Sequence, residues 1–418
     1  MQKTDKNTLS LLFVLFIFFG IAFTVIDPLI PIISEEFNIG YDKIGLILFA
    51  SSSISLIATF LSGRFSDKYD LKKIIMTGAL FLAAGFMIYG FFLSLIVLAL
   101  TVIFFRVGCG ILDSSIHAFV SKLYYRKHSA VFVKLDLFWY IGAVIGPLLI
   151  SILLYLKVDT RYAFLGFFVS IVIVLVLFLR YYSGLRENRN KINSEDLLKT
   201  NGPETEDIKE ALKEGASGIE QNSELNNYIK IMKNPVILLC SIGLFFYIGI
   251  FSLLSTWLTT YFADFNIPVS FSSAVLSVFW AFNAIGIVIA GRLIRRFNEL
   301  KLLLIFSIAG GISAAFYSMM PDIYVKIVFL ILQAIFYSSF FPLLNAVAVH
   351  ENARSSGTIL GITLSISVIG LIFFQPVSGA IMEYFGTNGI NYLLLITAFL
   401  LFLSIVLLYK RLSKKPGY

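Results

Sequence analysis

Long stretches of apolar residues dominate the pattern of this chain, and short polar segments separate them. A helix needs about 20 residues to cross the hydrocarbon core of a bilayer, and the apolar stretches reach that length. Their approximate limits are 9–33, 44–62, 74–92, 95–121, 132–156 and 162–182, then 235–263, 270–291, 302–320, 323–349, 357–382 and 391–410. The pattern predicts an all-α membrane protein with twelve transmembrane helices, six in each half.

One polar turn occurs twice. The turn at 63–73 reads GRFSDKYDLKK, and 228 positions later a diverged copy at 291–301 reads GRLIRRFNELK. A glycine, an arginine, an apolar residue, an aromatic residue and a final lysine recur between apolar stretches in both halves. This repeat predicts two pseudo-symmetric six-helix bundles, an architecture typical of secondary transporters. The expected units are a bundle at 1–183, a cytoplasmic linker at 184–233, a second bundle at 234–411 and a tail at 412–418.

Composition agrees with a membrane protein. The chain is 58% hydrophobic and 14% charged, whereas soluble domains carry about 25% charged residues. It contains no His-Glu-x-x-His, Gly-x-Ser-x-Gly or Walker sequence, so we expect neither an enzyme nor an ATP-driven pump, and no cofactor. Cys109 and Cys240 both fall inside predicted helices, which argues against a disulfide framework or a metal site.

The basic residues are distributed unevenly between the two sides of the predicted membrane. Of the 33 Lys and Arg, 27 fall in connections on the side of the termini and only four on the other side. Because basic loops stay in the cytoplasm, we expect a multi-pass protein of the cell membrane with both termini cytoplasmic. The net charge of +8 therefore reflects topology and does not indicate a nucleic-acid partner.

The central connection at 184–233 has a different composition. It is rich in Glu, Lys, Asn, Ser and Gly and contains few aromatic residues, so it has too little apolar surface to fold alone. Two interpretations stay open for it, a flexible interdomain linker and a regulatory docking segment.

Two charged residues lie deep inside predicted spans, where a charge costs about 2.5–3.5 kcal/mol or more and generally serves function. Asp27 interrupts the first span beside Pro28, and Arg106 lies in the fourth span. At ~1.5 Å per residue their depths differ by only ~6 Å. We expect a pair in which the carboxylate alternates between a proton and a cationic or polar substrate. The alternative is a static pair that locks two helices together.

A second charged group is expected nearer the cytoplasmic ends of the fourth and fifth spans. Asp113 follows Arg106 by seven residues, on nearly the same helix face, and His117 follows Asp113 by four. Lys134 and Asp136 enter the fifth span at comparable depth. These four residues are expected to form one network, in which Asp113 takes part in proton coupling or substrate binding with Asp27 and Arg106. The other three, His117, Lys134 and Asp136, are a candidate proton relay. Alternatively, Lys134 neutralises Asp113 structurally and His117 is a satisfied histidine close to the interface.

The first basic turn, with Gly63, Asp67, Lys68 and Lys72, resembles the loop signature between helices 2 and 3 of the major facilitator superfamily. It departs from that signature at Asp70, where the family usually has glycine. The resemblance implies that Gly63 permits close helix packing and that Asp67 caps the eleventh helix in the other half, which latches the outward-facing state. Alternatively, the lysines only hold the turn in the cytoplasm.

Two further segments resemble signatures of the drug:proton antiporters in this superfamily. Arg106-x-x-Cys109-Gly110 resembles the helix 4 signature, with Cys109 in place of the usual glutamine. Gly142, Gly146 and Pro147 resemble the helix 5 signature, which the family uses to pack that helix tightly and block leak. This likeness favours efflux over uptake.

The second half offers mainly neutral polar groups to the expected central cavity: Asn283, Gln333, Tyr337, Asn345 and Gln375. Proton chemistry is therefore expected in the first half only. The predicted function is alternating-access, proton-coupled efflux of small lipophilic or cationic compounds by a monomer whose partners are protons, its substrate and membrane lipids. The alternatives are transport of a sugar, organic anion or other small metabolite, and a non-transporting membrane sensor.

Overall fold

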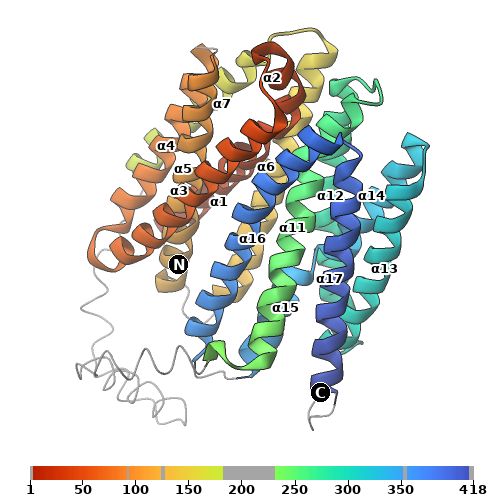
Figure 1. The fold of residues 1–418 in the computed structure, drawn as a ribbon. Helices are drawn as coiled ribbons and strands as arrows, with labels where there is room; N and C mark the ends of the chain where they lie inside the picture. Colours follow the sequence, from red (N-terminus) through yellow and green to blue (C-terminus); the bar gives the residue numbers. More distant parts are fainter. Residues whose placement is uncertain (1–2, 92–93, 124–127, 182–230, 352–354, 414–418) are drawn as a thin grey trace, which may run out of the picture.

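The computed structural model describes residues 3–91, 94–123, 128–181, 231–351 and 355–413, and within these ranges the chain is almost entirely helical (Figure 1). Most of the predicted linker and the end of the predicted tail lie outside the described residues. Twelve helical spans in the described part are long and apolar enough to cross a membrane. The predicted fold class is confirmed.

The first bundle contains six spans. The first span is divided into α1 (Lys3–Thr24), a 3-10 turn η1 (Asp27–Leu29) and α2 (Ile30–Phe37). The other five are α3 (Tyr41–Lys68), α4 (Leu71–Phe91), α5 (Leu95–Leu123), α6 (His128–Tyr155) and α7 (Arg161–Tyr181).

The second bundle repeats this arrangement. Its spans are α11 (Pro235–Ala263), α12 (Val269–Leu293), α13 (Glu299–Met319), α14 (Ile323–Tyr337) continued by α15 (Phe340–His350), α16 (Ser356–Phe385) and α17 (Gly389–Leu412). Because twelve is an even number, α1 begins and α17 ends at the same face of the molecule. We call this the terminal face, and the face where α2 ends the opposite face (Figure 1).

The packing of two glycines shows the internal repeat in three dimensions. A Cβ added at Gly142 of α6 would lie 2.0 Å from the carbonyl oxygen of Ile17 in α1. A Cβ added at Gly370 of α16 would lie 2.7 Å from the carbonyl oxygen of Phe245 in α11. Gly370 follows Gly142 by 228 positions and Phe245 follows Ile17 by 228 positions, which is the same interval that separates the two basic turns. The fifth span of each bundle therefore packs backbone to backbone on the first span of its own bundle.

The two bundles meet between the opposite face and the middle of the membrane. The amide of Tyr41 in α3 donates to Glu383 Oε2 in α16 at 2.8 Å, and deeper in the same helix pair Ser52 Oγ donates to Gln375 Oε1 at 2.8 Å. The other crossing joins α6 to α12, where Ser151 Oγ donates to the carbonyl of Ser270 at 2.6 Å.

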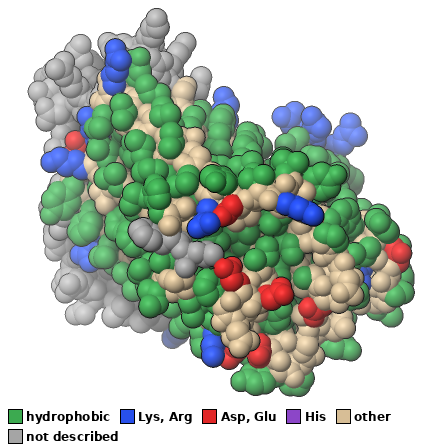
Figure 2. Space-filling model, turned by 90° about the horizontal axis from the view of Figure 1, so that it is seen from above, with side chains coloured by type: hydrophobic (Ala, Val, Ile, Leu, Met, Phe, Trp, Pro, Cys, Tyr) green, Lys and Arg blue, Asp and Glu red, His purple; other side chains and the backbone are tan. Residues whose placement is uncertain are grey.

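In the described part of the chain, the bundles contact each other mainly through α3 with α16, α6 with α12, η1 with α11 and α12, and α2 with α11. Neither α1 nor α5 packs on any helix of the second bundle to an extent comparable with the α3–α16 and α6–α12 contacts. Seen from the opposite face, the surface carries both acidic and basic side chains among hydrophobic groups (Figure 2). The molecule is thus held together at the opposite face.

Candidate functional site

Asp27 lies at the break in the first span. Pro28 has no backbone N–H and so favours the interruption between α1 and α2, where Asp27 is only 4% exposed. The Asp27 carbonyl oxygen accepts a hydrogen bond from Thr259 Oγ1 of α11 at 3.0 Å, so the second bundle satisfies a backbone group that the break leaves without a helical partner. Among the described residues, no hydrogen bond or ion pair is made to the Asp27 carboxylate.

Arg106 of α5 is the basic residue that was predicted to pair with Asp27. Its side chain is 7% exposed, and its guanidinium lies over the ring of Phe23 at 4.1 Å from the centroid. Asp27 and Arg106 interact electrostatically, but within the described part of the chain they form no ion pair within 4.0 Å. The two charges therefore interact through space, and among the described residues the Asp27 carboxylate has no direct hydrogen-bond or ion-pair partner.

The second charged group lies on the terminal side of this pair. His117 Nδ1 lies 2.7 Å from the carbonyl oxygen of Asp113 and 3.2 Å from its Oδ1. Because a carbonyl oxygen can only accept, Nδ1 carries a proton. Asp136 of α6 is exposed and interacts electrostatically with His117 and Asp113. The structure thus brings these three side chains together across α5 and α6.

Lys134 does not join this group by an ion pair. It is exposed, and among the described residues it forms no salt bridge with Asp113 or Asp136. Residues two positions apart point to different sides of a helix, which separates Lys134 from Asp136. Within the described chain, His117 is the basic side chain that interacts with both Asp113 and Asp136.

The basic turn connects α3 to α4. Gly63 approaches Ser114 of α5, whose Oγ would lie 3.4 Å from an added Cβ. The backbone of Asp67 and Lys68 forms the end of α3, and their side chains are outside the described residues. Asp70 Oδ1 accepts a hydrogen bond from the amide of Lys72 at 3.0 Å, so the residue that replaces the family glycine caps the start of α4.

Gly142, Gly146 and Pro147 form the contact of α6 with α1. An added Cβ at Gly146 would lie 3.0 Å from Thr24 Oγ1. Pro147 lies inside α6 and cannot donate to the carbonyl of Ala143 four residues earlier. Thr24 Oγ1 donates to that carbonyl at 3.4 Å. A hydroxyl from the first span thus partly replaces the backbone donor that proline lacks.

The neutral polar residues of the second bundle are all at least nine-tenths buried. Asn283 and Gln333 donate to carbonyls of their own helices, and Asn345 accepts from Thr363 at 2.6 Å. The hydroxyl of Tyr337 is enclosed without a hydrogen-bond partner. Of the five predicted residues, the structure brings Gln375 to the interface between the bundles, where Ser52 contacts it.

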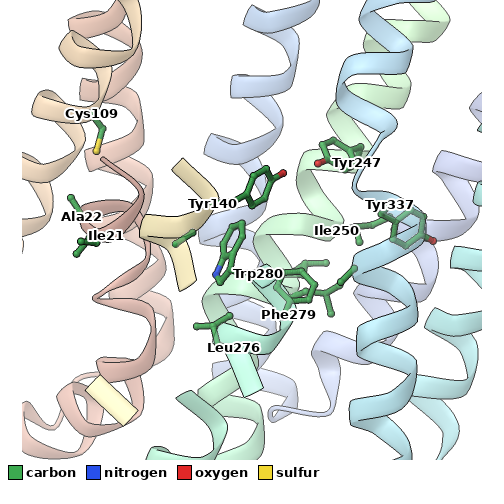
Figure 3. Close-up of a cluster of buried hydrophobic side chains, with 14 of the residues drawn as sticks. Ile21, Ala22, Cys109, Tyr140, Tyr247, Ile250, Leu276, Phe279, Trp280 and Tyr337 are labelled. Atoms are coloured by element: carbon green, nitrogen blue, oxygen red, sulfur yellow. The ribbon is translucent and has the colours of Figure 1, made fainter. Parts of the chain in front are cut away.

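An aromatic group at the same interface was not singled out from the sequence. Trp139 and Tyr140 of α6 contact Trp280 of α12, with ring centroids 5.2 and 6.3 Å apart. Phe251 of α11 contacts Trp280 from another side at 4.8 Å. Figure 3 shows Tyr140 and Trp280 between the two bundles, with Tyr247 beyond them. Forty-two Phe and 20 Tyr hide such a cluster in the sequence, since most aromatic positions look alike.

Two homologous bundles with buried charges and polar groups at their junction define the architecture of a secondary transporter. The chain belongs to the major facilitator superfamily, because the model of the family described as "Major Facilitator Superfamily" matches residues 12–351 and 263–417. It is therefore a multi-pass membrane transporter of this superfamily.

Two curated relatives are similar in sequence. One is "Protein TsgA homolog" of Buchnera aphidicola subsp. Schizaphis graminum, which is 23% identical over 367 residues and 85% of each chain. The other is "Bypass of stop codon protein 6" of Saccharomyces cerevisiae, which is 22% identical over 68% of this chain and 56% of that protein.

Solved structures share the fold. A bacterial homolog of the human lysosomal transporter Spinster, in an inward-facing and occupied conformation, superimposes with a TM-score of 0.75 at 12% identity over 99% of this chain and 98% of that chain. The nucleoside transporter NupG superimposes with a TM-score of 0.70 at 14% identity over 99% of this chain and 100% of that chain.

Proposed function

We propose that this protein is a proton-coupled transporter that exports small lipophilic or cationic compounds by alternating access. The terminal face would be cytoplasmic, in accordance with the distribution of Lys and Arg along the chain. In this scheme the described structure, joined at the opposite face, is the state that loads substrate from the terminal side.

The observation that carries the proposal is the placement of Asp27. Its carboxylate is buried, has no direct partner among the described residues and interacts electrostatically with Arg106. Its backbone carbonyl is bonded to Thr259 of the other bundle. A group that can take up or release a proton is therefore attached to the contact that must break when the opposite face opens.

The chemistry proposed for Asp27 follows from its surroundings. Neutralisation by a proton removes the attraction to Arg106 and the cost of a buried carboxylate. A cation that binds near the carboxylate has the same electrostatic effect. Proton and cationic substrate would therefore compete for one state of the protein, which is the requirement for exchange of one against the other.

The carboxylates on the terminal side are consistent with the proposed loading of cationic substrates from that side. Asp113 and Asp136 are accessible, with the Asp113 side chain 47% exposed, and His117 bonds to Asp113. These groups would pass protons between the terminal side and Asp27 and would concentrate cations there. Arg106 is the residue proposed to set the charge balance of Asp27.

The test is substrate-driven proton movement in proteoliposomes, screened over lipophilic cationic dyes, sugars, amino acids and nucleosides. We expect cationic dyes to drive proton movement in the opposite direction. Asp27→Asn should abolish accumulation against a gradient, because the side chain can no longer take up or release a proton, while the protein still folds and inserts into the membrane. Asp159→Asn, which changes a loop carboxylate paired with Arg161, is the matched control and should behave as wild type.

The outcomes separate the alternatives. Proton coupling to a sugar or another metabolite but to no cation would support the metabolite transporter instead. Wild-type accumulation by Asp27→Asn would remove Asp27 from the coupling mechanism. Reconstituted protein that moves none of these solutes would favour a membrane sensor.

A further inference from the structure

A groove runs between α13 and α17 on the outer surface of the second bundle. The two helices pack on each other, on the side of the second bundle that faces away from the first (Figure 1). The groove has a volume of about 300 Å³, and six of its lining residues are Ile308, Gly311 and Ile312 from α13 and Leu395, Phe399 and Phe402 from α17. Both helices are transmembrane spans, and Ile308, Ile312 and Phe399 are exposed. The groove therefore opens toward the hydrocarbon of the bilayer.

The groove is apolar and open at its floor. Its one hydroxyl-bearing side chain, Ser307, donates to the carbonyl of Leu304 at 2.8 Å and so needs no further partner. A Cβ added at Gly311 would meet nothing within 4 Å. The corresponding residue of the first bundle, 228 positions earlier, is Ala83 of α4, which is only 4% exposed. The second bundle thus has open apolar space where the first bundle packs a side chain.

Both helices that form the groove carry a lysine at the terminal face. Lys301 lies in the first turn of α13, eleven positions before Ile312. Lys410 lies in the last turn of α17, eleven positions after Phe399. Eleven residues make about three helical turns, so each lysine projects from the same face of its helix as a groove residue. The two lysines therefore lie at the terminal end of the groove.

The protein does not balance the charge of these lysines. Both side chains are exposed, and in the described part of the chain neither forms an ion pair. The helix α17 contains no Asp or Glu, and the one acidic residue of α13, Glu299, lies 3.6 Å from Nδ1 of His350. Lysines at the ends of transmembrane helices extend their ammonium groups to the membrane interface. There they attract the phosphates of anionic lipids.

The depth of the groove matches one leaflet of a bilayer. Gly311 follows Lys301 by ten residues, which corresponds to about 15 Å along the helix. The hydrocarbon core is about 30 Å thick, so one leaflet contributes about 15 Å. A hydrocarbon chain that starts at the two lysines therefore passes over Gly311 and ends near the middle of the membrane.

We propose that the groove between α13 and α17 binds one anionic phospholipid of the leaflet on the terminal side. An acyl chain fills the groove over Gly311, and the phosphate lies at Lys301 and Lys410. The apolar lining selects a hydrocarbon chain, and the two unbalanced charges select an anionic headgroup over a zwitterionic one. The bound lipid stabilises the pairing of α13 with α17. This site lies outside the junction of the bundles and is independent of the proposed proton coupling.

Binding of two lipids to the delipidated full-length protein, measured by native mass spectrometry, tests the site. The probes are dioleoylphosphatidylglycerol and dioleoylphosphatidylcholine, which share their acyl chains but have an anionic and a zwitterionic headgroup. One phosphatidylglycerol should bind at least about tenfold more tightly than phosphatidylcholine, because two lysines contact its phosphate. A phosphatidylglycerol with a photoactivatable diazirine in its acyl chain should label peptides of α13 or α17.

Two changes to the protein separate the headgroup from the chain. The double variant Lys301→Gln with Lys410→Gln should weaken phosphatidylglycerol about tenfold and leave phosphatidylcholine unchanged. Gly311→Leu places a side chain in open space and should weaken both lipids by about the same factor, since their chains are identical.

Two matched controls should bind phosphatidylglycerol within about twofold of wild type. Lys73→Gln removes the lysine that corresponds to Lys301 in the first basic turn, 228 positions earlier. Gly166→Leu fills another open groove, between α6 and α7, where the neighbouring Arg161 is paired with Asp159.

Three binding results would overturn the lipid site. One is equal affinity of the wild-type protein for the two lipids, a comparison that needs no variant to fold. The second is unchanged phosphatidylglycerol binding in both the double variant and Gly311→Leu. The third is a loss in Lys73→Gln as large as in the double variant, since the charge of the whole face would then hold the lipid. Photolabelling confined to other helices would also contradict the site. A wild-type dimer that binds no lipid and that Gly311→Leu dissociates would assign the groove to a second copy of this chain instead.

Discussion

Thr24 and Pro147 show how one side chain compensates for a missing backbone donor inside a membrane. No water is available in the hydrocarbon core, so a free carbonyl is costly. The hydroxyl of Thr24 donates to the carbonyls of Gly20 at 3.0 Å and Ala143 at 3.4 Å. Proline is thus tolerated in α6 because a residue of α1 lies beside it. The close approach that makes this possible depends on Gly142 and Gly146.

The first prediction concerns Gly142. In Gly142→Ala the new methyl group would lie 2.0 Å from the carbonyl oxygen of Ile17, so α6 must move away from α1. We expect the free energy of unfolding to fall by about 1–3 kcal/mol, seen as a lower melting temperature of the purified protein. The control is Gly166→Ala in α7, where an added Cβ meets nothing within 4 Å. Equal melting temperatures for the two variants would contradict the tight α1–α6 contact.

The helices α3 and α16 are joined most tightly where α3 begins and α16 ends. Glu383 Oε2 accepts a hydrogen bond from the amide of Tyr41 at 2.8 Å. This amide lies in the first turn of α3, where backbone N–H groups have no partner within the helix. An added Cβ at Gly40 would lie 2.9 Å from the Glu383 carboxylate. A carboxylate of one bundle therefore caps a helix of the other, and the helix dipole strengthens the contact.

The second prediction is that this contact stabilises closure of the opposite face. In Glu383→Ala, a single cysteine placed at buried Ile44 should react faster with a membrane-impermeant maleimide, in a background without Cys109 and Cys240. Glu383→Gln keeps an acceptor oxygen and should give an intermediate rate. Glu35→Ala removes a carboxylate of α2 at the same face and is the control. If the cysteine of Ile44→Cys reacts at the same rate in all three variants, Glu383 is an ordinary surface residue.

At the level of elements, the hydrophobic pattern was sufficient to predict twelve spans and the internal repeat. The interruption of the first span was also visible, because Asp27 and Pro28 stand within an apolar stretch. The resemblance predicted one contact between the bundles, from Asp67, whose side chain lies outside the described residues, but the contacts that the structure shows were not predictable. Thr259 and Asp27 are 232 positions apart, and nothing in the pattern around Thr259 distinguishes it from other hydroxyl residues of α11. The resemblance predicted that the fifth span, α6, packs tightly. The structure identifies α1 as the helix against which it packs.

The third prediction concerns the whole molecule and the predicted linker, which lies mostly outside the described residues. Its composition argues against a packed core, so replacing 190–225 with a Gly/Ser chain of equal length should preserve transport. Such a chain has a root-mean-square span of roughly 30–36 Å. Shortening it to a few residues should slow turnover, because it would restrain the relative motion of the bundles. Loss of transport in the equal-length variant, with normal expression and insertion, would show that the segment makes a specific contact.

The arrangement of the whole molecule requires its two faces to open in turn. The bundles are joined at the opposite face by Tyr41–Glu383, Ser52–Gln375 and Ser151–Ser270. Among the described residues, neither α1 nor α5 packs extensively on the second bundle. A rocking motion about the junction would therefore exchange one set of contacts for another. Asp27 lies at that junction, because its carbonyl oxygen accepts a hydrogen bond from Thr259 of the second bundle, so the proposed uptake of a proton there would act on a contact that the motion changes.

Distances between the bundles, measured at both faces of one protein in lipid bilayers, test this account most directly. Spin-label pairs at Lys43 and Tyr384 report the opposite face, and pairs at Tyr69 and Lys233 report the terminal face. We predict that Asp27→Asn and Glu383→Ala lengthen the opposite-face distance and shorten the terminal-face distance together. Distances that stay fixed in both variants, or that lengthen at both faces at once, would contradict alternating access by two rocking bundles.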